Sequence, residues 1–499
     1  MSGKKDKLKD LSKEAYEFLQ KIKKGKKVDE VEEEHQDFLI KFNEIIEVKN
    51  GQVKPCEEIR DELGEVVPDV NANIKDVRKR YKKWLHLEDD NRVDIMMACA
   101  LSKKFEGTPI WMIIVGPSGD GKTEMIRALE GMDDIKKIQQ LTENTLISGN
   151  PKVDDLAPNL DEKIMLITDF ASILSLKAYK KRELWAQLRN LYDGEAYKNT
   201  GAGTEAEYDD IRTTMLACST PAIDNQILIH QDLGTRELIY RTNGAGVKEK
   251  QLMALENEEK ENKMRRELKE VVHGFLKDRE LKDIEITDDI RDFIIEQAEY
   301  LSKMRAAASY DSTSGELRKD VDVEVPTRLV KQFKRLYICL RSLDEDYPDE
   351  RAKKIIKHVV ESSCFQLRVK TKKLLGKENP EELTTSKVAE KLQIGKKTAK
   401  RHLNALWNIG EIQKRVERQK KFGRIMEISY WRNKGIEYDL PQFKPLTDIE
   451  DGHCEYCDKE YKKLKWKDED GYKLCDDCKE EEIEAAKERA RNKQNQEDA

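Results

Sequence analysis

Residues 116–123, GPSGDGKT, carry glycines, a lysine and a threonine at the spacing of a phosphate-binding loop. The glycines let backbone N–H groups turn inward around phosphate oxygens, and a helix beginning near Lys122 adds its positive end. Lys122 can then reach the β- and γ-phosphates, and Thr123 can ligate Mg²⁺. The apolar run IWMIIV before the motif and EMIRALEGM after it predict strand, loop and helix. We therefore expect ATP and Mg²⁺ to be bound by Gly116, Pro117, Ser118, Gly119, Asp120, Gly121, Lys122 and Thr123.

Two later apolar runs end in polar residues that could take part in the same chemistry. KIMLITDF ends near Asp169, where an acid can hold Mg²⁺ through water or orient an attacking water. TTMLACST ends in Ser219 and Thr220, which could contact the γ-phosphate or that water. The simpler interpretations are a helix cap for Asp169 and a plain strand exit through Pro221.

The elements that must position these residues follow from the apolar pattern. Short apolar runs alternate with helical segments over 91–246, which predicts an α/β core with a parallel sheet. Residues 1–90 are rich in Lys and Glu with helical spacing, and 247–372 read as almost wholly helical. We expect one long helix over 247–276 and another over 286–308, capped by Thr287.

A basic segment follows the helical region. Residues 385–435 hold 14 Lys and Arg against 4 Glu, a net +10 in a chain whose total is −6. TSKVAEKL and KKTAKRHLNALWNIG, separated by a Gly-containing turn, have helix-turn-helix spacing, with Ala399, Leu403 and Leu406 on one face. EIQKRVE and RIMEISYW alternate as two strands around RQKKFG, which resembles a wing. We expect a winged helix-turn-helix over 373–436, and a winged helix that contacts protein is the alternative.

That module predicts a DNA-binding surface, because concentrated positive charge favours phosphate contacts. The start of a recognition helix enters the major groove. The residues expected to contact DNA are Lys396, Lys397, Lys400 and Arg401, with Lys420 and Lys421 in the wing.

Four cysteines form two C-x₂-C pairs separated by seventeen residues: Cys454, Cys457, Cys475 and Cys478. This spacing predicts a tetrahedral, structural Zn²⁺ site in a zinc ribbon over 437–499, followed by a charged tail. The segment between the pairs should form a hairpin, and His453 is not needed as a ligand. A redox dithiol pair is the alternative. The other five cysteines are scattered, which suits a reducing compartment.

The order of phosphate loop, acidic strand end and polar third strand over 91–372 resembles the AAA+ ATPases and superfamily 3 helicases. The sequence is similar in character to the ATPases of phages and mobile elements that have an MCM-like lid. In this chain the lid would be the helical region 247–372. The resemblance implies an arginine finger at Arg236 or Arg241 in DLGTRELIYRT, and a sensor 2 arginine at Arg328 in EVPTRLVKQFKRL. It also implies a DNA-contacting pore hairpin within 188–210 and a homo-oligomeric ring, such as a hexamer. Surface ion pairs are the simpler interpretation of the arginines.

One departure from that family concerns the acidic strand end. AAA+ enzymes usually carry Asp-Glu there, whereas this chain has Thr168-Asp169-Phe170. Either Asp169 holds the metal and Glu183 or Glu195 polarises the water, or Asp169 stands in the Glu register with Thr168 in the Asp register.

The expected function is a DNA-dependent ATPase, a helicase or replication initiator of a phage or mobile element. A nucleotide-switched DNA-binding regulator is the alternative, and a signalling ATPase whose C-terminal modules bind protein fits the +10 segment poorly. No apolar run is long enough to span a membrane, and the N-terminus lacks the apolar stretch of a signal peptide. A soluble, cytoplasmic protein is therefore expected.

Overall fold

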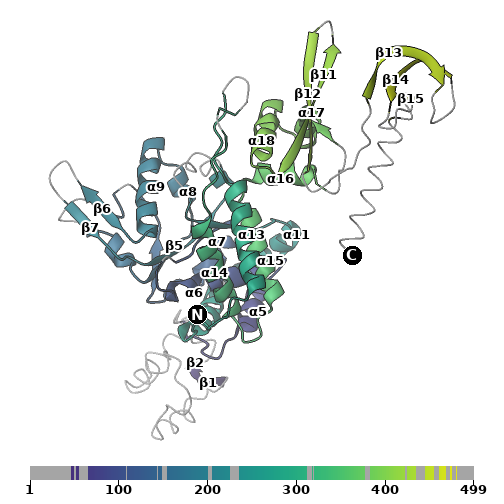
Figure 1. The fold of residues 1–499 in the computed structure, drawn as a ribbon. Helices are drawn as coiled ribbons and strands as arrows, with labels where there is room; N and C mark the ends of the chain where they lie inside the picture. The colour runs from purple at the N-terminus through teal and green to yellow at the C-terminus, as the bar shows by residue number, and fades with distance from the viewer. Residues whose placement is uncertain are drawn as a thin grey trace. The chain divides into compact units, whose positions relative to one another are not determined.

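The computed structural model falls into two compact units, residues 1–307 with 324–365 and residues 308–323 with 366–499 (Figure 1). The structure describes residues 46–49, 52–55, 66–107, 109–142, 144–148, 154–199, 205–224, 235–311, 317–318, 320–376, 382–421, 424–433, 444–453, 460–467, 473–474 and 479. No helix among these residues is both long and apolar enough to cross a membrane.

The first unit is built on a parallel sheet of five strands in the order β4-β5-β8-β3-β9. The strands are β3 (Trp111–Val115), β4 (Ile135–Ile138), β5 (Lys163–Ile167), β8 (Thr213–Ser219) and β9 (Leu238–Arg241). Every residue of β3 and β8 is buried, as strands covered on both faces require. The parallel α/β core predicted from the sequence is confirmed.

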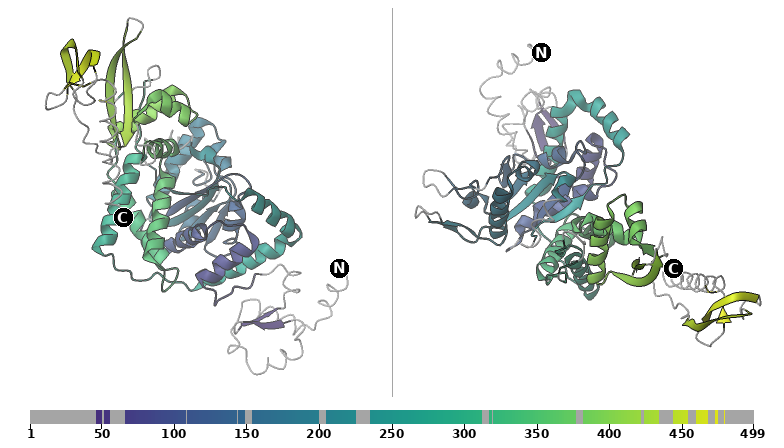
Figure 2. Two further views of the ribbon diagram at one scale, coloured as in Figure 1. Left: turned by 90° about the vertical axis from the view of Figure 1, so that its right-hand side faces the viewer. Right: turned by 90° about the horizontal axis from the view of Figure 1, so that it is seen from above.

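Helices cover the sheet, whose strands lie in the middle of this unit (Figure 2). α8 (Ala171–Leu174) and α9 (Ala178–Tyr192) lie against the face formed by Trp111, Ile113 and Val115. The rings of Trp111 and Tyr192 meet edge to face with centroids 5.3 Å apart. α6 (Asn91–Leu101) and α7 (Lys122–Arg127) also pack on β8.

The helical region that follows the sheet is more divided than predicted. It contains α11 (Val247–Asn257), α12 (Glu261–Lys277), α13 (Asp288–Met304), α14 (Thr327–Arg341) and α15 (Asp349–Ser363). The single helix predicted over 247–276 is wrong, because a 3₁₀ turn at Glu258–Lys260 separates α11 from α12. α12 buries a full apolar face, partly against α5 (Ile74–Trp84), whereas α11 buries no residue. Thr287 is the N-cap of α13, as predicted, but its side chain makes no capping hydrogen bond.

The N-terminal region is not wholly helical, which corrects the sequence prediction. β1 (Ile46–Lys49) and β2 (Gln52–Pro55) pair antiparallel. The sequence between them is Asn50-Gly51, the strongest short-range hairpin signal, and could have predicted this pair. The helices expected before residue 46 lie outside the described residues.

The second unit begins its described C-terminal part with α16 (Gln366–Leu374). β10 (Leu383–Thr384), α17 (Thr385–Lys391), α18 (Lys396–Asn408), β11 (Ile412–Lys421) and β12 (Arg424–Asn433) follow. The three strands form an antiparallel sheet in the order β10-β12-β11. Thr384 caps α17 by accepting a hydrogen bond from Lys387 N. Ala399, Leu403 and Leu406 of α18 are buried, as their spacing predicted.

Three more antiparallel strands lie beyond this sheet. They are β13 (Lys444–His453), β14 (Glu460–Lys467) and β15 (Lys473–Leu474). Cys454, Cys457, Cys475 and Cys478 lie outside the described residues, so the zinc site stays a prediction. Among the residues that are described, no group of three or more metal-ligating side chains comes together.

Candidate nucleotide-binding site

The phosphate loop joins the middle of the sheet to α7. β3 ends at Val115, the loop runs from Gly116 to Gly121, and α7 begins at Lys122. β3 lies between β8 and β9, so the chain order of the strands reverses beside it. In open parallel sheets, ligands bind outside the carboxyl ends of the strands at such a switch point. The loop occupies that position.

Two glycines are required by the backbone of this loop. The Gly116 N–H donates to the Ser219 carbonyl at 3.2 Å, and a Cβ on Gly116 would lie 2.0 Å from Thr242 Oγ1. Gly121 caps α7 with φ of 75°, in the left-handed region that glycine adopts without strain. Pro117, Ser118 and Gly119 between them are exposed. The result is a cradle of backbone groups at the start of a helix, which fits the phosphates of a nucleotide.

Lys122 is buried and lies across the loop. Its Nζ donates to the carbonyls of Gly116 at 2.8 Å and Pro117 at 2.6 Å. Burial lowers the pKa of Lys122 below its usual value, although the nearby Asp120 carboxylate favours the charged form. The ammonium group is thus held inside the loop, within reach of phosphate oxygens that the loop would bind.

The acidic strand end lies next to the loop. Thr123 Oγ1 donates to the Thr168 carbonyl at 3.4 Å, so the first turn of α7 meets the end of β5. Asp169 follows Thr168 and is exposed, while the N–H of Phe170 donates to the Cys218 carbonyl of β8 at 2.9 Å. A threonine hydroxyl and a carboxylate are suitable oxygen ligands for Mg²⁺ bound with phosphates. These residues fit the predicted metal site.

Ser219 and Thr220 lie at the same edge of the sheet. Ser219 ends β8, is buried, and its hydroxyl donates to the Thr220 carbonyl at 3.3 Å. Because its own carbonyl accepts the Gly116 N–H, the end of β8 is fixed to the start of the loop. The structure therefore brings together Lys122, Thr123, Asp169, Ser219 and Thr220.

The side chain of Asp120, within the loop, contacts two cations from other helices. The residue is only 5% exposed, and its side chain points into the protein, where Lys250 Nζ of α11 lies 2.5 Å from Oδ1. Arg92 Nη1 of α6 lies 3.6 Å from Oδ2 and donates to the Asp120 carbonyl at 3.4 Å. Burial raises the pKa of Asp120, but the hydrogen bonds from Lys250 and Thr242 and the charge of Arg92 outweigh it, so the pKa lies below the usual value. Asp120 therefore attaches the loop to α6 and α11.

Arg241 is bound within its own chain. It ends β9 opposite Val115, and its guanidinium donates to both carboxylate oxygens of Asp224. Arg241 Nε donates to the Ser362 carbonyl at 2.9 Å, and its backbone N–H donates to Ser362 Oγ at 3.1 Å. This arginine connects β9, α15 and the segment after β8, close to the loop of the same chain.

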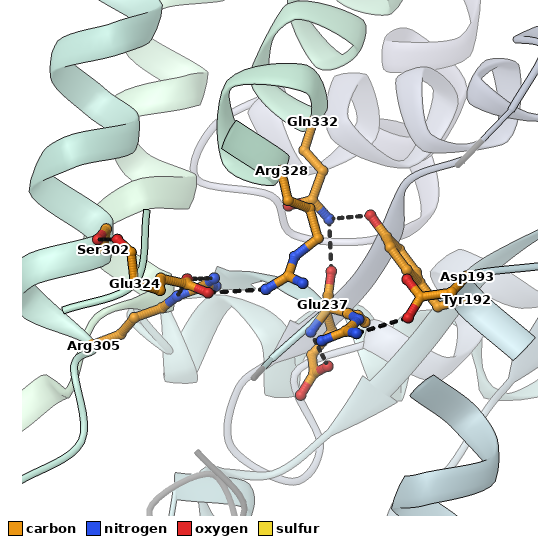
Figure 3. A network of polar contacts seen from close by, with 9 residues as sticks. Tyr192, Asp193, Glu237, Ser302, Arg305, Glu324, Arg328 and Gln332 are labelled. Atoms are coloured by element: carbon orange, nitrogen blue, oxygen red, sulfur yellow. Dashed lines mark hydrogen bonds and ion pairs between the residues drawn. The ribbon is translucent and has the colours of Figure 1, made fainter. Parts of the chain in front are cut away.

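Arg236 and Arg328 form part of a separate polar network (Figure 3). Arg236 Nη2 donates to Asp193 Oδ2 at 2.7 Å, and Arg328 Nη2 donates to Glu324 Oε2 at 3.0 Å. Gln332 Nε2, one helical turn after Arg328, donates to the Arg236 carbonyl at 2.6 Å. Burial lowers the pKa of Arg328, and the neighbouring Arg236 charge lowers it further.

The two arginines lie away from the loop of their own chain. β9 is parallel to β3, and Arg236 precedes β9 whereas the loop follows β3. The amino ends and carboxyl ends of parallel strands lie at opposite edges of a sheet. Arg236, and Arg328 with it, is therefore at the edge opposite the loop.

The remaining acids and the predicted hairpin lie along α9 and after it. Glu183 is exposed on α9, and Glu195 is exposed directly before β6 (Ala196–Asn199). β6 pairs antiparallel with β7 (Glu205–Tyr208), where a hairpin was predicted. Of the three candidate acids, Asp169 is the one that directly follows the residue bound by Thr123.

The predicted DNA-contacting residues lie in the second unit. Lys396 and Lys397 are exposed in the first turn of α18, and Lys400 is half-buried. Arg401 lies on a different face, with its guanidinium 5.6 Å from the ring centroid of Tyr310. Lys420 and Lys421 belong to β11, but their side chains lie outside the described residues.

No protein-family model matches the chain, and no curated protein matches it. Among solved structures, an MCM homologue from Methanopyrus kandleri is 14% identical over 62% of this chain and 61% of that chain, with a TM-score of 0.33. The C-terminal region of NrS-1 is 14% identical over 52% and 61%, with a TM-score of 0.26. The active helicase Cch of SCCmec type IV is 12% identical over 72% and 71%, with a TM-score of 0.31.

The chain thus covers 61% of the length of each of the first two structures. At TM-scores of 0.26–0.33 these similarities carry no weight for function. The functional conclusion rests on the residues of this chain.

Proposed function

We propose that the chain is a DNA-dependent ATPase, a helicase or replication initiator of the phage or mobile-element type. The observation that carries the proposal is the cluster at the switch point of the sheet. There Lys122, Thr123, Asp169 and Ser219 lie around a glycine cradle. The same cluster supports ATP and Mg²⁺ as ligands.

Each residue of the cluster has a role that its position supports. The loop N–H groups and Lys122 would bind the β- and γ-phosphates, while Thr123 and Asp169 would hold the metal ion. Ser219 and Thr220 would contact the γ-phosphate or the attacking water. Bound Mg²⁺ would neutralise the charge that develops on the phosphates during transfer.

A second copy of the chain would complete the site. Arg236 and Arg328 lie at the sheet edge opposite the loop, so they suit the nucleotide of a neighbour better than their own. This supports a ring in which Arg236 is the finger and Arg328 the sensor 2 arginine. Arg241 is the weaker finger candidate, because it ends β9 opposite Val115 and so lies at the edge that carries the loop of its own chain.

DNA would be bound by the second unit. The order β10-α17-α18-β11-β12 and the antiparallel sheet support a winged helix-turn-helix, with Lys396, Lys397 and Lys400 toward the phosphates. The pairing of β14 with β15 is compatible with a ribbon that Zn²⁺ on the four cysteines would stabilise.

The second candidate is a nucleotide-switched DNA-binding regulator. Thr168-Asp169-Phe170 provides one acid where an Asp-Glu pair would provide two, which favours slow hydrolysis. In that case nucleotide would change DNA affinity without sustained turnover.

The test is the rate of ATP hydrolysis with and without single-stranded and duplex DNA, for the wild type and Lys122→Ala. We expect DNA to stimulate the wild type and Lys122→Ala to lose turnover while remaining folded. Turnover that is negligible with DNA, together with an ATP-dependent DNA affinity, would establish the regulator instead. Equal turnover in both proteins would remove the loop from the reaction.

A further inference from the structure

Two cations and a large aromatic ring lie along one side of α18. Lys396 and Trp407 are exposed at its two ends, Lys400 is half-buried, and Asn404 between Lys400 and Trp407 is buried. Lys396, Lys400 and Trp407 lie four and seven residues apart, which puts them on one side of a helix with 3.6 residues per turn. Ala399, Leu403 and Leu406 occupy the buried side. Trp407 is 47% exposed, an unusual position for the largest apolar side chain.

The ammonium group of Lys414 places a positive charge beside the ring of Trp407. The Lys414 ammonium lies 5.0 Å from the centroid of Trp407 and 5.2 Å from that of Trp431. Trp431 is the cross-strand partner of Lys414, is buried, and donates from Nε1 to Thr385 Oγ1 at 2.9 Å. Because Trp431 is fixed, Lys414 is held between the two indoles by cation–π attraction.

The surface continues onto β11, and a described acidic residue, Glu427 of β12, lies on the same face, paired with Arg418. Val416 is two residues after Lys414, shares its face, and is 47% exposed. Glu417 points to the other face of β11, where Arg415 binds Glu417 and Glu382 and lies 4.6 Å from the Tyr430 ring centroid. Trp407, Lys414 and Val416 are called here the indole patch.

We propose that the indole patch is a stacking site for an unpaired base of single-stranded DNA, beside a backbone track formed by Lys396 and Lys400. The proposal rests on the DNA-binding role given above. Proteins that bind single strands combine a cationic track with exposed aromatic rings, since every base has a face that can stack. The net +10 of residues 385–435 selects a polyanion over an apolar peptide as the occupant. A base stacked on Trp407 would sit at the end of α18 opposite Lys396.

The experiment compares the full-length wild type, Trp407→Ala, Trp407→Phe and Lys400→Ala on oligothymidine and on a blunt duplex. Trp407→Ala should lose roughly five- to hundredfold in affinity for oligothymidine, as expected for one stacked base, and Trp407→Phe should keep most of it. The dependence of affinity on salt should be unchanged in Trp407→Ala, because stacking releases no counterions. Lys400→Ala should instead lower the salt slope by about one.

Fluorescence gives a direct readout of stacking. Quenching of the wild type by oligothymidine should exceed that of Trp407→Phe, and the difference reports Trp407 alone. Tyr179→Ala, which removes an exposed aromatic ring of the first unit, is the matched control and should bind as the wild type does.

Oligothymidine affinity that is the same in Trp407→Ala and the wild type would overturn the stacking site and assign the patch to a protein partner. An equal loss on oligothymidine and duplex would also overturn it, because a stacked unpaired base is absent from the blunt duplex. A wild type that binds neither DNA would overturn the proposed function itself, which separates the two failures.

Discussion

Lys250 and Asp120 form an ion pair, 2.5 Å between Nζ and Oδ1, that ties the first helix after the sheet to the phosphate loop. Asp120 is almost fully buried, and Lys250 is the charged group that approaches it most closely. α11 buries no residue of its own, so this contact is a main attachment of the helix to the site.

Replacing Lys250 by Ala should weaken ATP binding. The change leaves the buried Asp120 carboxylate with Arg92 as its remaining ion-pair partner, and an unsatisfied buried group costs about 1–3 kcal/mol. The loop should then depart from its cradle geometry, and affinity measured by titration calorimetry should fall several-fold or more. Lys248→Ala, an exposed change on the same helix, is the control. Wild-type affinity in Lys250→Ala would show that the pair does not hold the loop.

Arg236→Ala should abolish ATP turnover without lowering ATP affinity in the same chain. Arginine fingers contribute three powers of ten or more in rate, and Arg236 lies at the far edge from its own loop. Mixing Arg236→Ala with Lys122→Ala should restore part of the turnover, because one mixed interface combines an intact loop with an intact arginine.

Arg241→Ala serves as the contrast for that experiment. It should lower the stability of the first unit by removing the contacts with Asp224 and Ser362, and mixing should restore no turnover. Full turnover by an Arg236→Ala chain, or by a wild-type monomer, would contradict catalysis across an interface.

The first unit should become less stable as pH falls from about 6.5 to about 4. Burial, with a smaller contribution from the Lys269 charge, lowers the pKa of His273 on α12 from 6.5 to about 4. The unfolded chain binds a proton in this window while the folded chain does not, so the free energy of unfolding falls with pH by about 3 kcal/mol in total. Urea unfolding at pH 7 and pH 5 measures the loss, which should be smaller in His273→Gln. An equal loss in both proteins would assign the acid sensitivity to other groups.

Purified protein should contain one Zn²⁺ per chain, bound by the four cysteines, and a chelator should unfold residues 450–480 while leaving ATP affinity unchanged. The segment between the cysteine pairs has few apolar residues, so metal binding must supply its folding free energy, on the order of 10 kcal/mol. Elemental analysis and nucleotide titration before and after chelation measure the two quantities. Metal-free protein with a reversible disulfide would identify a redox pair.

The sequence predicted the strands that contain a long apolar run, and missed the two outermost strands of the sheet. β3 and β8 are buried throughout and β5 is buried after Lys163, whereas β4 reads IKKI and only its last residue is buried. The missed β9 matters most for the site. Arg236 and Arg241 are five residues apart. Arg236 precedes the amino end of β9 and Arg241 stands at its carboxyl end, so the two arginines lie at opposite ends of the parallel strands. Spacing without the strand could not separate their roles.

The sequence pattern also could not predict contacts between residues that lie far apart in the chain. Asp120 belongs to the phosphate-loop motif, but its partners Arg92 and Lys250 come from helices before and after the sheet. Trp407 reads as one more residue of an amphipathic helix, and it is the cross-strand pair of Lys414 with Trp431 that gives it a charged neighbour. Tertiary packing decides both.

The parallel course of β9 and β3 fixes how many complete sites an assembly can have. In the proposed assembly each chain contributes a loop at one edge and an arginine pair at the other, so a site exists only where two chains meet. A closed ring has as many complete sites as chains, whereas an open arc always has one fewer. The loop at one end of the arc could bind ATP but not turn it over.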